Sequence, residues 1–358
     1  MHANDTNNGQ TRAAVETAVT IKLGLDEHAD QVTTCRQIDG RLPQPAQKLS
    51  EERLLKLVSE HRAQGHQVYT CYEAGPCGYW LHRQLEALGA VNYVVAPQRW
   101  DEQGRRMKTD KLDARALCQR LDRYVRGNTD AFTVVRVPTP EEERWRALCR
   151  QRATLVKERQ RCELRGHGLM LAQHIRGGPG WWEAAKWQEM VPQLPDWLRE
   201  NLARWQQQAV QLQGQIDALT PRIAAHSAGQ SAPKGMGALT KALLDAEILD
   251  WGRFVNRRQP GSYGGLCPSE DSSGRRRRQG SISKHGNPQV RHLLVEAVWR
   301  MIEHQPDYPP IQRVRAAKGT RARKRAIVAA ARRLLVDLWR LNTGRQTAQQ
   351  LKLVLMQF

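Results

Sequence analysis

Four carboxylates in the first third of the chain are placed where an enzyme acting on nucleic acid could use them together. Asp26 closes one apolar run and Glu73 closes a second. Asp110 and Asp113 follow, three residues apart. Residues at i and i+3 share one face of a helix, and open α/β sheets collect their sites at the carboxyl ends of strands. All four side chains can therefore converge on one point.

Such a convergence has a chemical meaning. Like charges repel, so grouped carboxylates cost free energy unless cations neutralise them. Paired Mg²⁺ ions about 4 Å apart are the usual partners in phosphoryl transfer, where they clamp the attacking and leaving oxygens. Single Asp and Glu residues are ordinary on protein surfaces, and it is the placement that favours a site. We interpret these residues as catalytic ligands of two Mg²⁺ ions: Asp26, Glu73, Asp110 and Asp113.

The elements around these carboxylates alternate strands and helices between about residues 18 and 125. The pattern predicts strands near 19–26, 31–38, 67–73 and 91–95, and helices from residue 50, over 76–88 and around 110–121. Ser50 is a good N-cap, and two glutamates follow it in the first turn. The resulting β-β-(β)-α-β-α-β-α order predicts a ribonuclease-H-like layered α/β domain.

Two helical stretches occupy the middle of the chain. The first repeats apolar residues every seven positions from Leu148 to Leu169. The second alternates spacings of four and three from Leu198 to Ile223, which is the pattern of a coiled-coil seam. This helical arm fits an oligomerisation device and fits an intramolecular helical hairpin equally well.

The last third of the chain predicts a mainly α-helical domain. A loop rich in Ser, Gly and Arg covers residues 264–286 and leads into a helix with Asn287 as N-cap and Pro288 at its first position. A loop of this kind before a helix N-terminus can bind phosphate. The following residues are predicted to be buried in that helix and in a final basic helix: Val290, Leu293, Leu294, Ala297, Val298, Met301, Ile327, Ala330, Ala331, Leu334 and Leu338.

The net charge points to a polyanionic partner. The chain carries 56 Lys and Arg against 36 Asp and Glu, a net charge of +20, and residues 270–340 alone hold 17 basic and 6 acidic residues. Charge runs are often only solvated faces, but a surplus this concentrated favours a phosphate backbone. The predicted nucleic-acid contacts are Arg105, Arg106, Lys108, Arg275, Arg276, Arg277, Arg278, Lys284, His285, Arg323, Lys324, Arg332 and Arg333.

These patterns divide the chain into a polar tail (1–17), a catalytic domain (18–135), an arm (136–230), a C-terminal domain (231–345) and a short tail (346–358).

The seven cysteines show neither a CxxC pair nor zinc-ligand spacing, so we expect reduced thiols in a cytosolic protein. Nothing in the sequence resembles a signal peptide or an apolar span of ~20 residues, so we expect no membrane partner. A Gly-x-x-x-x-Gly-Lys-Ser/Thr motif is missing, which disfavours a P-loop enzyme.

Two ordered sets of motifs resemble the DEDD insertion-sequence transposases. The first set is Leu25-Asp26, Tyr72-Glu-Ala-Gly75 and Lys108-Thr-Asp-Lys-Leu-Asp-Ala114, and the second is Gly265-Leu-Cys-Pro-Ser269, Ser272-Ser-Gly274 and Gly280-Ser-Ile-Ser-Lys-His-Gly-Asn287. The resemblance covers about residues 19 to 340. Family members pair a Holliday-junction-resolvase-like (RuvC-like) N-terminal domain with a serine-bearing C-terminal transposase domain.

The resemblance implies DNA recombination guided by a structured non-coding RNA from the element itself, which pairs with donor and target DNA. The family's acidic tetrad corresponds to the four carboxylates above. Its nucleophilic serine corresponds to Ser273, which would attack DNA with the help of Mg²⁺ and form a 5′-phosphoserine intermediate. Ser272, Ser281 and Ser283 are the competing serines. The resemblance also implies a homo-oligomer, a dimer or a dimer of dimers, in the prokaryotic cytoplasm and on the nucleoid when active.

Two other functions stay open on the sequence. A Mg²⁺-dependent Holliday-junction resolvase or nuclease would use the same carboxylates with water as the nucleophile, and would not need the Ser-Gly motif. A non-catalytic nucleic-acid-binding protein would need the basic surface alone.

Overall fold

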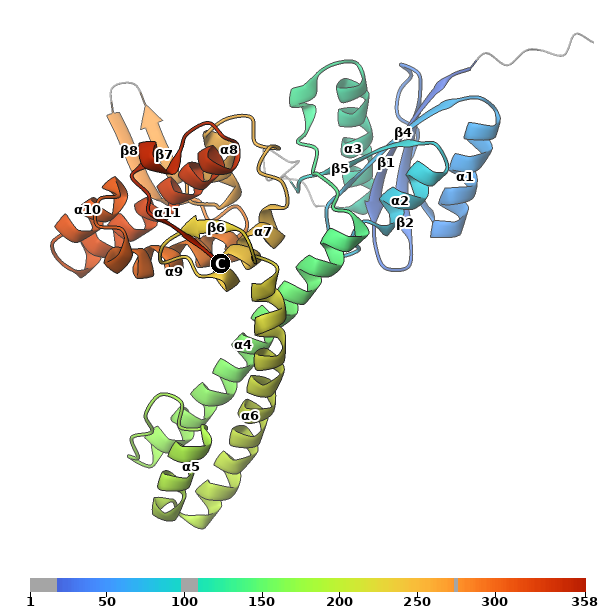
Figure 1. The fold of residues 1–358 in the computed structure, drawn as a ribbon. Coiled ribbons are helices and arrows are strands. Elements are labelled where there is room, and N and C mark those ends of the chain that lie inside the picture. The colour runs from blue at the N-terminus through green and yellow to red at the C-terminus, as the bar shows by residue number, and fades with distance from the viewer. Residues whose placement is uncertain (1–17, 98–108, 274–275) are drawn as a thin grey trace, which may run out of the picture. The chain divides into compact units, whose positions relative to one another are not determined.

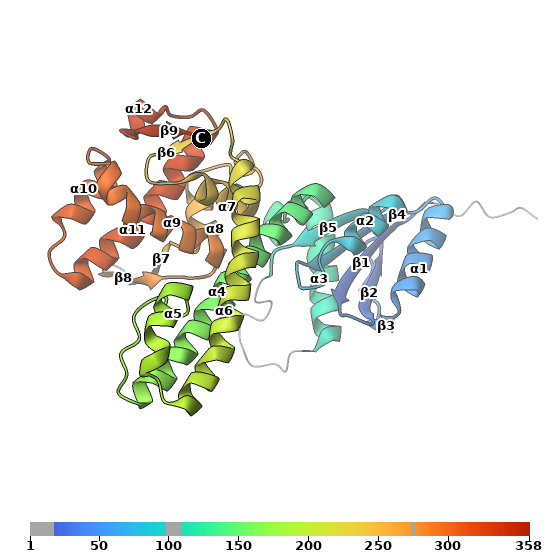
Figure 2. The same cartoon turned by 60° about the horizontal axis from the view of Figure 1, so that its bottom comes forward.

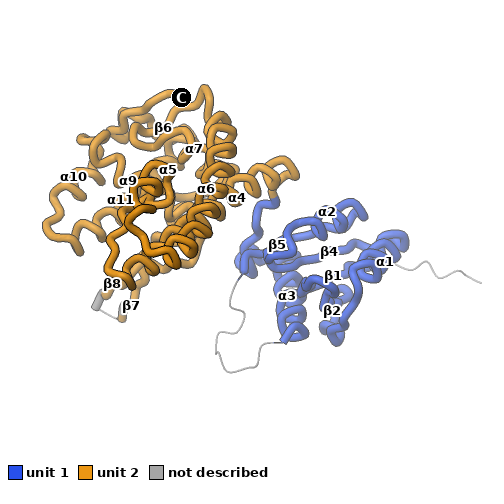
Figure 3. The backbone as a smooth tube through the Cα atoms, turned by 90° about the horizontal axis from the view of Figure 1, so that it is seen from below, with its two compact units in different colours: residues 1–137 blue, residues 138–358 orange. Residues whose placement is uncertain are grey.

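The computed structural model describes residues 18–97, 109–273 and 276–358 (Figure 1). Contacts within the chain divide it into two compact units, residues 1–137 and 138–358 (Figure 3). The described helices include none that is long and apolar enough to cross a membrane. Some predicted nucleic-acid contacts lie outside the described residues, namely Arg105, Arg106, Lys108, Arg275 and the side chains of Arg276 and Arg277.

Unit 1 is a five-stranded sheet with helices on both faces. Its elements are β1 (Thr20–Glu27), β2 (Val32–Ile38), β3 (Gln47–Leu49), α1 (Glu51–Ala63), β4 (Gln67–Glu73), α2 (Trp80–Ala87), β5 (Val91–Val95) and α3 (Asp110–Val125). The strand order is β3-β2-β1-β4-β5. β2 runs antiparallel to β1 and β3, whereas β1, β4 and β5 are parallel to one another. The predicted alternation of strands and helices is confirmed.

The two faces of this sheet carry different helices (Figure 2). On one face, Ile21, Leu23 and Leu25 of β1 join buried side chains of α1 and α2. On the other face, α3 packs on β1, β2 and β4. Successive strand residues point to opposite faces, so Lys22 and Gly24, which alternate with these three residues, face α3.

Helix α2 begins later than predicted. The sequence predicts a helix from Pro76, but residues 76–79 form a turn and α2 starts at Trp80. Gly78 has φ +79°, a left-handed conformation that a helix does not allow and that glycine adopts at little cost. The early start was therefore wrong, and the turn places residues 76–77 at the carboxyl edge of the sheet.

The arm lies in unit 2. It consists of α4 (Pro140–Ala172), the short α5 (Ala184–Met190) and α6 (Asp196–Ala225). The capping box of Thr139 and Glu142 fixes the start of α4. In Figures 1 and 2, α4 and α6 lie side by side along most of their length.

The seam predicted in α6 is buried against α4 of the same chain. Leu198, Leu202 and Ala209 share one cluster with Cys162 and Met170 of α4. The structure thus forms the intramolecular helical hairpin, the second of the two arrangements that the heptad pattern allowed.

The rest of unit 2 is mainly helical, as predicted. Its elements are β6 (Ser231–Pro233), α7 (Ala238–Ile248), α8 (Arg258–Tyr263), β7 (Pro268–Ser273), β8 (Arg276–Ile282), α9 (Pro288–His304), α10 (Pro309–Ala316), α11 (Thr320–Asn342), α12 (Ala348–Leu351) and β9 (Leu355–Gln357). Asn287 caps α9 through its side-chain oxygen, and Pro288 opens the helix. All the residues predicted to be buried in α9 and α11 are buried.

Two segments differ from what the sequence predicts. Much of the Ser/Gly/Arg-rich segment is not a loop, because residues 268–273 and 276–282 pair as the antiparallel strands β7 and β8. Residues 346–358, expected as a tail, carry α12 and β9, and β9 pairs with β6. Leu351 and Leu353 are buried in the core of the unit. Both differences come from pairing between distant or polar residues, which hydrophobic periodicity does not reveal.

Candidate active site

Asp26 and Glu73 lie on neighbouring parallel strands at the same edge of the unit 1 sheet. The β1–β4 ladder pairs Leu25 with Tyr72, so Asp26 and Glu73 are the next residue on each strand. Both belong to the face that α3 covers, since the Cys71 thiol, two positions before Glu73, donates to the carbonyl of Leu117. Glu73 and Asp26 are both partly exposed.

Close packing of α3 on β1 brings the other two carboxylates to this edge. Gly24 makes that packing possible, because a Cβ there would overlap the backbone of Ala114 and Cys118. Farther along α3, Asp122 forms an ion pair with a residue of β1. Lys22 of β1 is buried, and its Nζ lies 2.6 Å from Asp122 Oδ1. Thr109 caps the helix by accepting from Leu112 N. The first turn of α3 carries both predicted carboxylates.

Asp26 and Asp110 converge on His28. Its Nε2 lies 3.4 Å from Asp26 Oδ2 and 3.7 Å from Asp110 Oδ1. One ligand atom from each of the three residues lies within 4.8 Å of the others. Lys48 of β3 approaches from the other side, with Nζ 3.5 Å from Asp110 Oδ2. The structure thus brings a histidine and a lysine to carboxylates that the sequence grouped without them.

The charges in this cluster act on one another. Burial raises the pKa of Asp26, and repulsion from Asp113 and Asp110 raises it further, while His28 acts in the opposite direction. Desolvation alone would also raise the pKa of Asp110. The hydrogen bond from Lys48 and the charge of His28 outweigh it, and the pKa of Asp110 is lowered. Repulsion of Asp26 by both α3 carboxylates shows that these three side chains share one electrostatic site.

The other two predicted ligands, Asp113 and Glu73, are not in this group of three residues. Asp113 is within electrostatic range of Asp26 but is not one of the three groups whose ligand atoms converge. Glu73 follows Tyr72 on β4 as Asp26 follows Leu25 on the neighbouring β1. Sequence reasoning missed His28 and Lys48. His28 had a readable signal, because it follows Asp26 by two positions on an extended segment and so shares its face.

This donor set fits a hard divalent cation. Asp26 and Asp110 would offer carboxylate oxygens, the ligands that Mg²⁺ and Mn²⁺ prefer, and His28 would add an imidazole nitrogen, which suits Mn²⁺ better than Mg²⁺. Burial is the main cause of the raised pKa of Asp26, and a bound cation would relieve the smaller contribution that comes from repulsion by Asp113 and Asp110.

Ser273 is the last residue of β7 and is exposed. Its backbone pairs with Arg276, and Ser272 pairs with Arg277. Of the competing serines, Ser281 lies on β8 and its carbonyl accepts from the hydroxyl of Ser269. Ser283 lies beyond β8, with its N–H bound to the carbonyl of Cys267. Ser272 and Ser273 are therefore nearest the hairpin tip, whereas Ser281 and Ser283 lie toward its base.

The described basic residues are not equally available. Arg278, Lys284, His285, Arg323 and Lys324 are exposed. The guanidinium of Arg323 lies 5.5 Å from the centre of the Trp299 ring, an arrangement that leaves its charge accessible.

Two arginines predicted to face outward on α11 are engaged within the protein. Arg333 is exposed as predicted (52%), and it is bound to the buried Asp337, with Nε 2.7 Å from Oδ2. Arg332 is partly buried and its side chain lies against Gly261.

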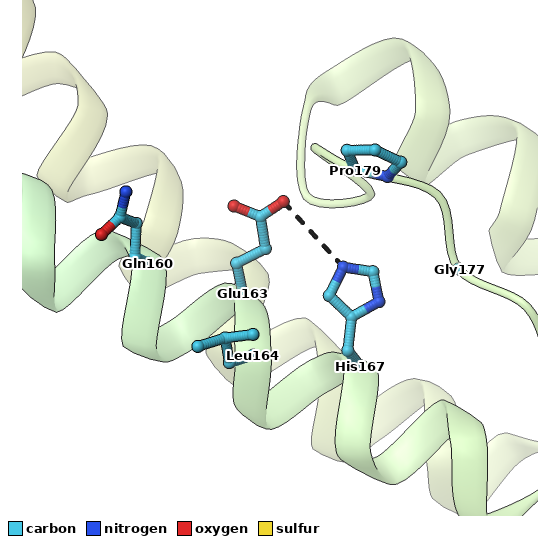
Figure 4. Close-up of a pocket in the computed structure, with 6 residues that line it drawn as sticks. All are labelled: Gln160, Glu163, Leu164, His167, Gly177 and Pro179. Atoms are coloured by element: carbon cyan, nitrogen blue, oxygen red, sulfur yellow. Dashed lines mark ion pairs between the residues drawn. The ribbon is translucent and has the colours of Figure 1, made fainter. Parts of the chain in front are cut away.

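A hollow on the arm holds none of the predicted site residues (Figure 4). It has a volume of about 410 Å³. Figure 4 shows Glu163 and His167 side by side on α4, with 4.0 Å between Oε1 and Nε2. The same carboxylate accepts a hydrogen bond from Gly180 N at 2.6 Å. Glu163 thus ties the loop after α4 to the helix, which is a structural role.

A second hollow, of about 430 Å³, lies on the α1/α2 side of the sheet edge, beside Glu27 and Trp80. Burial raises the pKa of Glu27 to about 7, and repulsion from Glu51 adds to this effect. The folded protein therefore binds this proton more tightly than the unfolded chain, whose glutamate titrates near 4.5. The stabilisation that the protonated Glu27 carboxyl contributes is fully present below pH 4.5, and it is lost as the pH rises through about 7.

Glu27→Gln should consequently gain stability relative to the wild type as the pH rises. We expect the difference in Tm between the variant and the wild type to increase from pH 5 to pH 8 in thermal denaturation. Glu52→Gln, an exposed change in the first turn of α1, controls for unrelated surface effects. A Tm difference between Glu27→Gln and the wild type that stays constant from pH 5 to pH 8 would contradict the raised pKa of Glu27.

Comparison with known proteins identifies the family of this chain. The family model described as "Transposase IS116/IS110/IS902 family" matches residues 231–310, which include the β7–β8 hairpin with Ser273. A Sinorhizobium fredii protein named "Putative transposase y4rJ" is 36% identical over 304 residues, covering 76% of each chain. The chain belongs to the IS116/IS110/IS902 family of insertion-sequence transposases. The predicted resemblance to insertion-sequence transposases is confirmed.

Other relatives extend the match. The transposase for insertion sequence element IS1111A of Coxiella burnetii is 26% identical over 291 residues, or 76% of this chain and 77% of that protein. The transposase for insertion sequence element IS1328 of Yersinia enterocolitica is 27% identical over 227 residues, or 61% of this chain and 66% of that protein. This chain is accordingly a DNA transposase, and its substrate is DNA.

Proposed function

We propose that this transposase cuts and rejoins DNA strands through a nucleophilic serine and a Mg²⁺-binding acidic site, under the guidance of an element-encoded RNA. The observation that carries the proposal is the convergence of Asp26 and Asp110 at the end of β1, close enough to Asp113 for mutual repulsion. Asp26, Glu73, Asp110 and Asp113 are the proposed ligands of two ions. His28 is the additional candidate ligand.

Unit 1 would be the ribonuclease-H-like, RuvC-like part of the enzyme. Support comes from the strand order β3-β2-β1-β4-β5 with β2 antiparallel to its neighbours. The helix after the last strand presents its acidic first turn to the end of the central strand. This places carboxylates where ligands bind in open α/β sheets.

Ser273 would supply the nucleophile. Its hydroxyl would attack phosphorus, the bond to the 3′ oxygen would break, and the 5′-phosphate would remain on serine. The serine proton would pass to solvent, and the 3′ oxygen would leave as a hydroxyl. Bound Mg²⁺ would supply positive charge that lowers the pKa of the serine hydroxyl and stabilises the leaving oxygen. The phosphoserine conserves the phosphodiester energy, so the strands can be rejoined without ATP.

The exposed basic residues of unit 2 would hold the nucleic acids. Arg278 and Lys284 lie on and after β8, and Arg323 and Lys324 lie in the first turns of α11. Their charges would neutralise phosphates of donor DNA, target DNA or guide RNA. A homo-oligomer, built in part by the α4–α6 arm, is the proposed assembly, because the serine and the carboxylates lie far apart in the sequence.

Strand exchange should require both Mg²⁺ and RNA. The purified protein would be incubated with element-end DNA, target DNA and transcripts of the non-coding DNA that flanks the reading frame. We expect recombinant junctions, detected by sequencing, only when the transcript and Mg²⁺ are both present. EDTA should abolish the product, and a scrambled transcript should not replace the native one.

Other outcomes would identify the alternatives. Cleavage without rejoining and without any need for Ser273 would indicate a nuclease that uses water. Binding of DNA and RNA with no cleaved product under all these conditions would indicate a non-catalytic protein. Recombination that proceeds equally well without RNA would refute guidance by RNA and leave the serine chemistry intact.

A further inference from the structure

Glu247, at the end of α7, is a buried carboxylate with strong partners on two other elements. Its side chain is 2% exposed. Arg150 of α4 donates to it through Nε and Nη2, each at 2.9 Å, and Asn287 Nδ2 donates at 2.6 Å. The hydroxyl of Tyr263 donates to the Glu247 carbonyl at 2.7 Å. One residue thus ties together α4, α7, α8 and the start of α9.

The β7–β8 hairpin that carries Ser273 is called the serine hairpin here. Tyr263 and Asn287, which pair below its two strands, form its root. Beyond the β7–β8 ladder, the two legs continue to pair: Ser283 N binds Cys267 O at 2.7 Å, and Asn287 N binds Tyr263 O at 2.7 Å. At Gly286 a Cβ would overlap the Tyr263 carbonyl oxygen, so the legs approach as closely as glycine allows.

The amide of Asn287 has a fixed orientation. Its Oδ1 accepts the helix-capping bonds from Gln289 N at 2.9 Å and Val290 N at 3.2 Å. Nδ2 is therefore turned toward Glu247. A shift of the Glu247 carboxylate would disturb the start of α9 and the hairpin root together.

A hairpin amplifies small movements of its root. Strand β7 spans Pro268–Ser273, and at ~3.3 Å per residue its tip lies roughly 15–20 Å beyond Pro268. A root tilt of about 5° would therefore move Ser273 by between ~1 and ~2 Å. Misplacement of a reacting group by ~1 Å can lower a rate ~10²-fold.

We propose that Glu247 is a positioning residue for Ser273, because it fixes the hairpin root to the arm helix α4 through Asn287, Tyr263 and Arg150. The role rests on the proposed serine chemistry. Glu247 does not itself touch DNA in this role. It sets the direction in which the hairpin presents its tip, and Arg150 makes that direction depend on the seating of α4.

The chain offers a matched control. Asp337 of α11 is also buried (1% exposed) and is also bound by two arginines, Arg333 at 2.7 Å and Arg340 at 3.0 Å. A tyrosine hydroxyl, that of Tyr308, donates to it at 2.9 Å. These bonds of Asp337 go to α11 and to the start of α10, not to the hairpin root, so loss of its charge tests buried ion pairs in general.

We would compare Glu247→Gln with Asp337→Asn for Tm, for affinity toward element-end DNA, and for the rate of the covalent protein–DNA adduct at saturating DNA and RNA. Both variants should lose stability. Only Glu247→Gln should slow adduct formation, by ~10- to 100-fold, with DNA affinity unchanged. Equal slowing in both variants, or no slowing in Glu247→Gln, would overturn the proposal.

A milder pair keeps the test decisive if the charge variants do not fold. Tyr263→Phe removes two bonds at the root, the one from the Tyr263 hydroxyl to the Glu247 carbonyl and the one from Asn287 Nδ2 to that hydroxyl. Tyr308→Phe removes the tyrosine bond to the Asp337 carboxylate. Only Tyr263→Phe should speed amide hydrogen exchange in residues 264–287 and slow the adduct. Exchange that is unchanged in Tyr263→Phe would refute the anchoring. A wild-type protein that forms no adduct would refute the proposed serine chemistry instead, and with it the role of Glu247 toward Ser273.

Discussion

Asp26→Asn is expected to abolish strand cleavage while leaving RNA binding almost unchanged. Asp26 stands at the centre of the acidic site, 3.4 Å from His28 and within range of Asp110 and Asp113. An amide cannot replace a carboxylate as a ligand of Mg²⁺ with the same charge, so transition-state stabilisation of several kcal/mol should be lost. We expect a rate at least ~10³-fold lower, or about 4 kcal/mol, in single-turnover cleavage of labelled DNA.

Loss of folding is not expected to explain this result. Burial and two neighbouring carboxylates already disfavour the charged form of Asp26, so the neutral amide should keep the Tm of the wild type or raise it at pH 8. Asp130→Asn, an exposed change in the same unit, is the control and should cleave normally. Cleavage by Asp26→Asn at the wild-type rate would eliminate the acidic site as the catalytic centre.

The local signals of the sequence predicted much of unit 1. Ser50 caps α1 as its side-chain chemistry requires, accepting from Arg53 N. The strand bearing Asp26 and the strand bearing Glu73 end within one residue of the predicted positions. These features depend on a few consecutive residues, and hydrophobic alternation or a capping side chain specifies them directly.

Two features that depend on pairing between segments were not predicted. Lys48 reaches Asp110 only because β3 pairs with β2, and β3 is three residues long with little apolar content. The strands β7 and β8 consist mostly of Ser, Arg, Gly and acidic residues, several of which are depleted in strands. Its strands form nevertheless because their backbone groups pair with each other and because Glu247 and Asn287 close the root.

The arm shows a different limit of sequence patterns. Heptad spacing in α6 specifies that one face is apolar, and it does not specify which helix covers that face. In this chain Cys162 and Met170 of α4 provide the cover. An oligomer that uses the arm would therefore need surface other than this seam, such as the exposed Leu164 and Leu171 on α4.

Ser273→Ala is expected to abolish a covalent protein–DNA adduct that the wild type forms. Ser273 is exposed at the end of β7, and its backbone pairs with Arg276 beside a four-arginine run that could seat a phosphate. Alanine removes the only nucleophilic atom and leaves the backbone pairing intact. The protein would be incubated with its RNA, Mg²⁺ and DNA labelled on the 5′-phosphate side of the cut. Denaturing electrophoresis should show a shifted band in the wild type and none in the variant.

Ser272→Ala provides the decisive comparison, because Ser272 is the neighbouring serine on β7 and competes for the role of nucleophile. A single serine should account for the whole adduct. Retention of the adduct in Ser272→Ala and its loss in Ser273→Ala would assign the nucleophile to Ser273. The reverse result would assign the nucleophile to Ser272. If cleavage continues in both variants without an adduct, the nucleophile is water and the acidic site works as a nuclease.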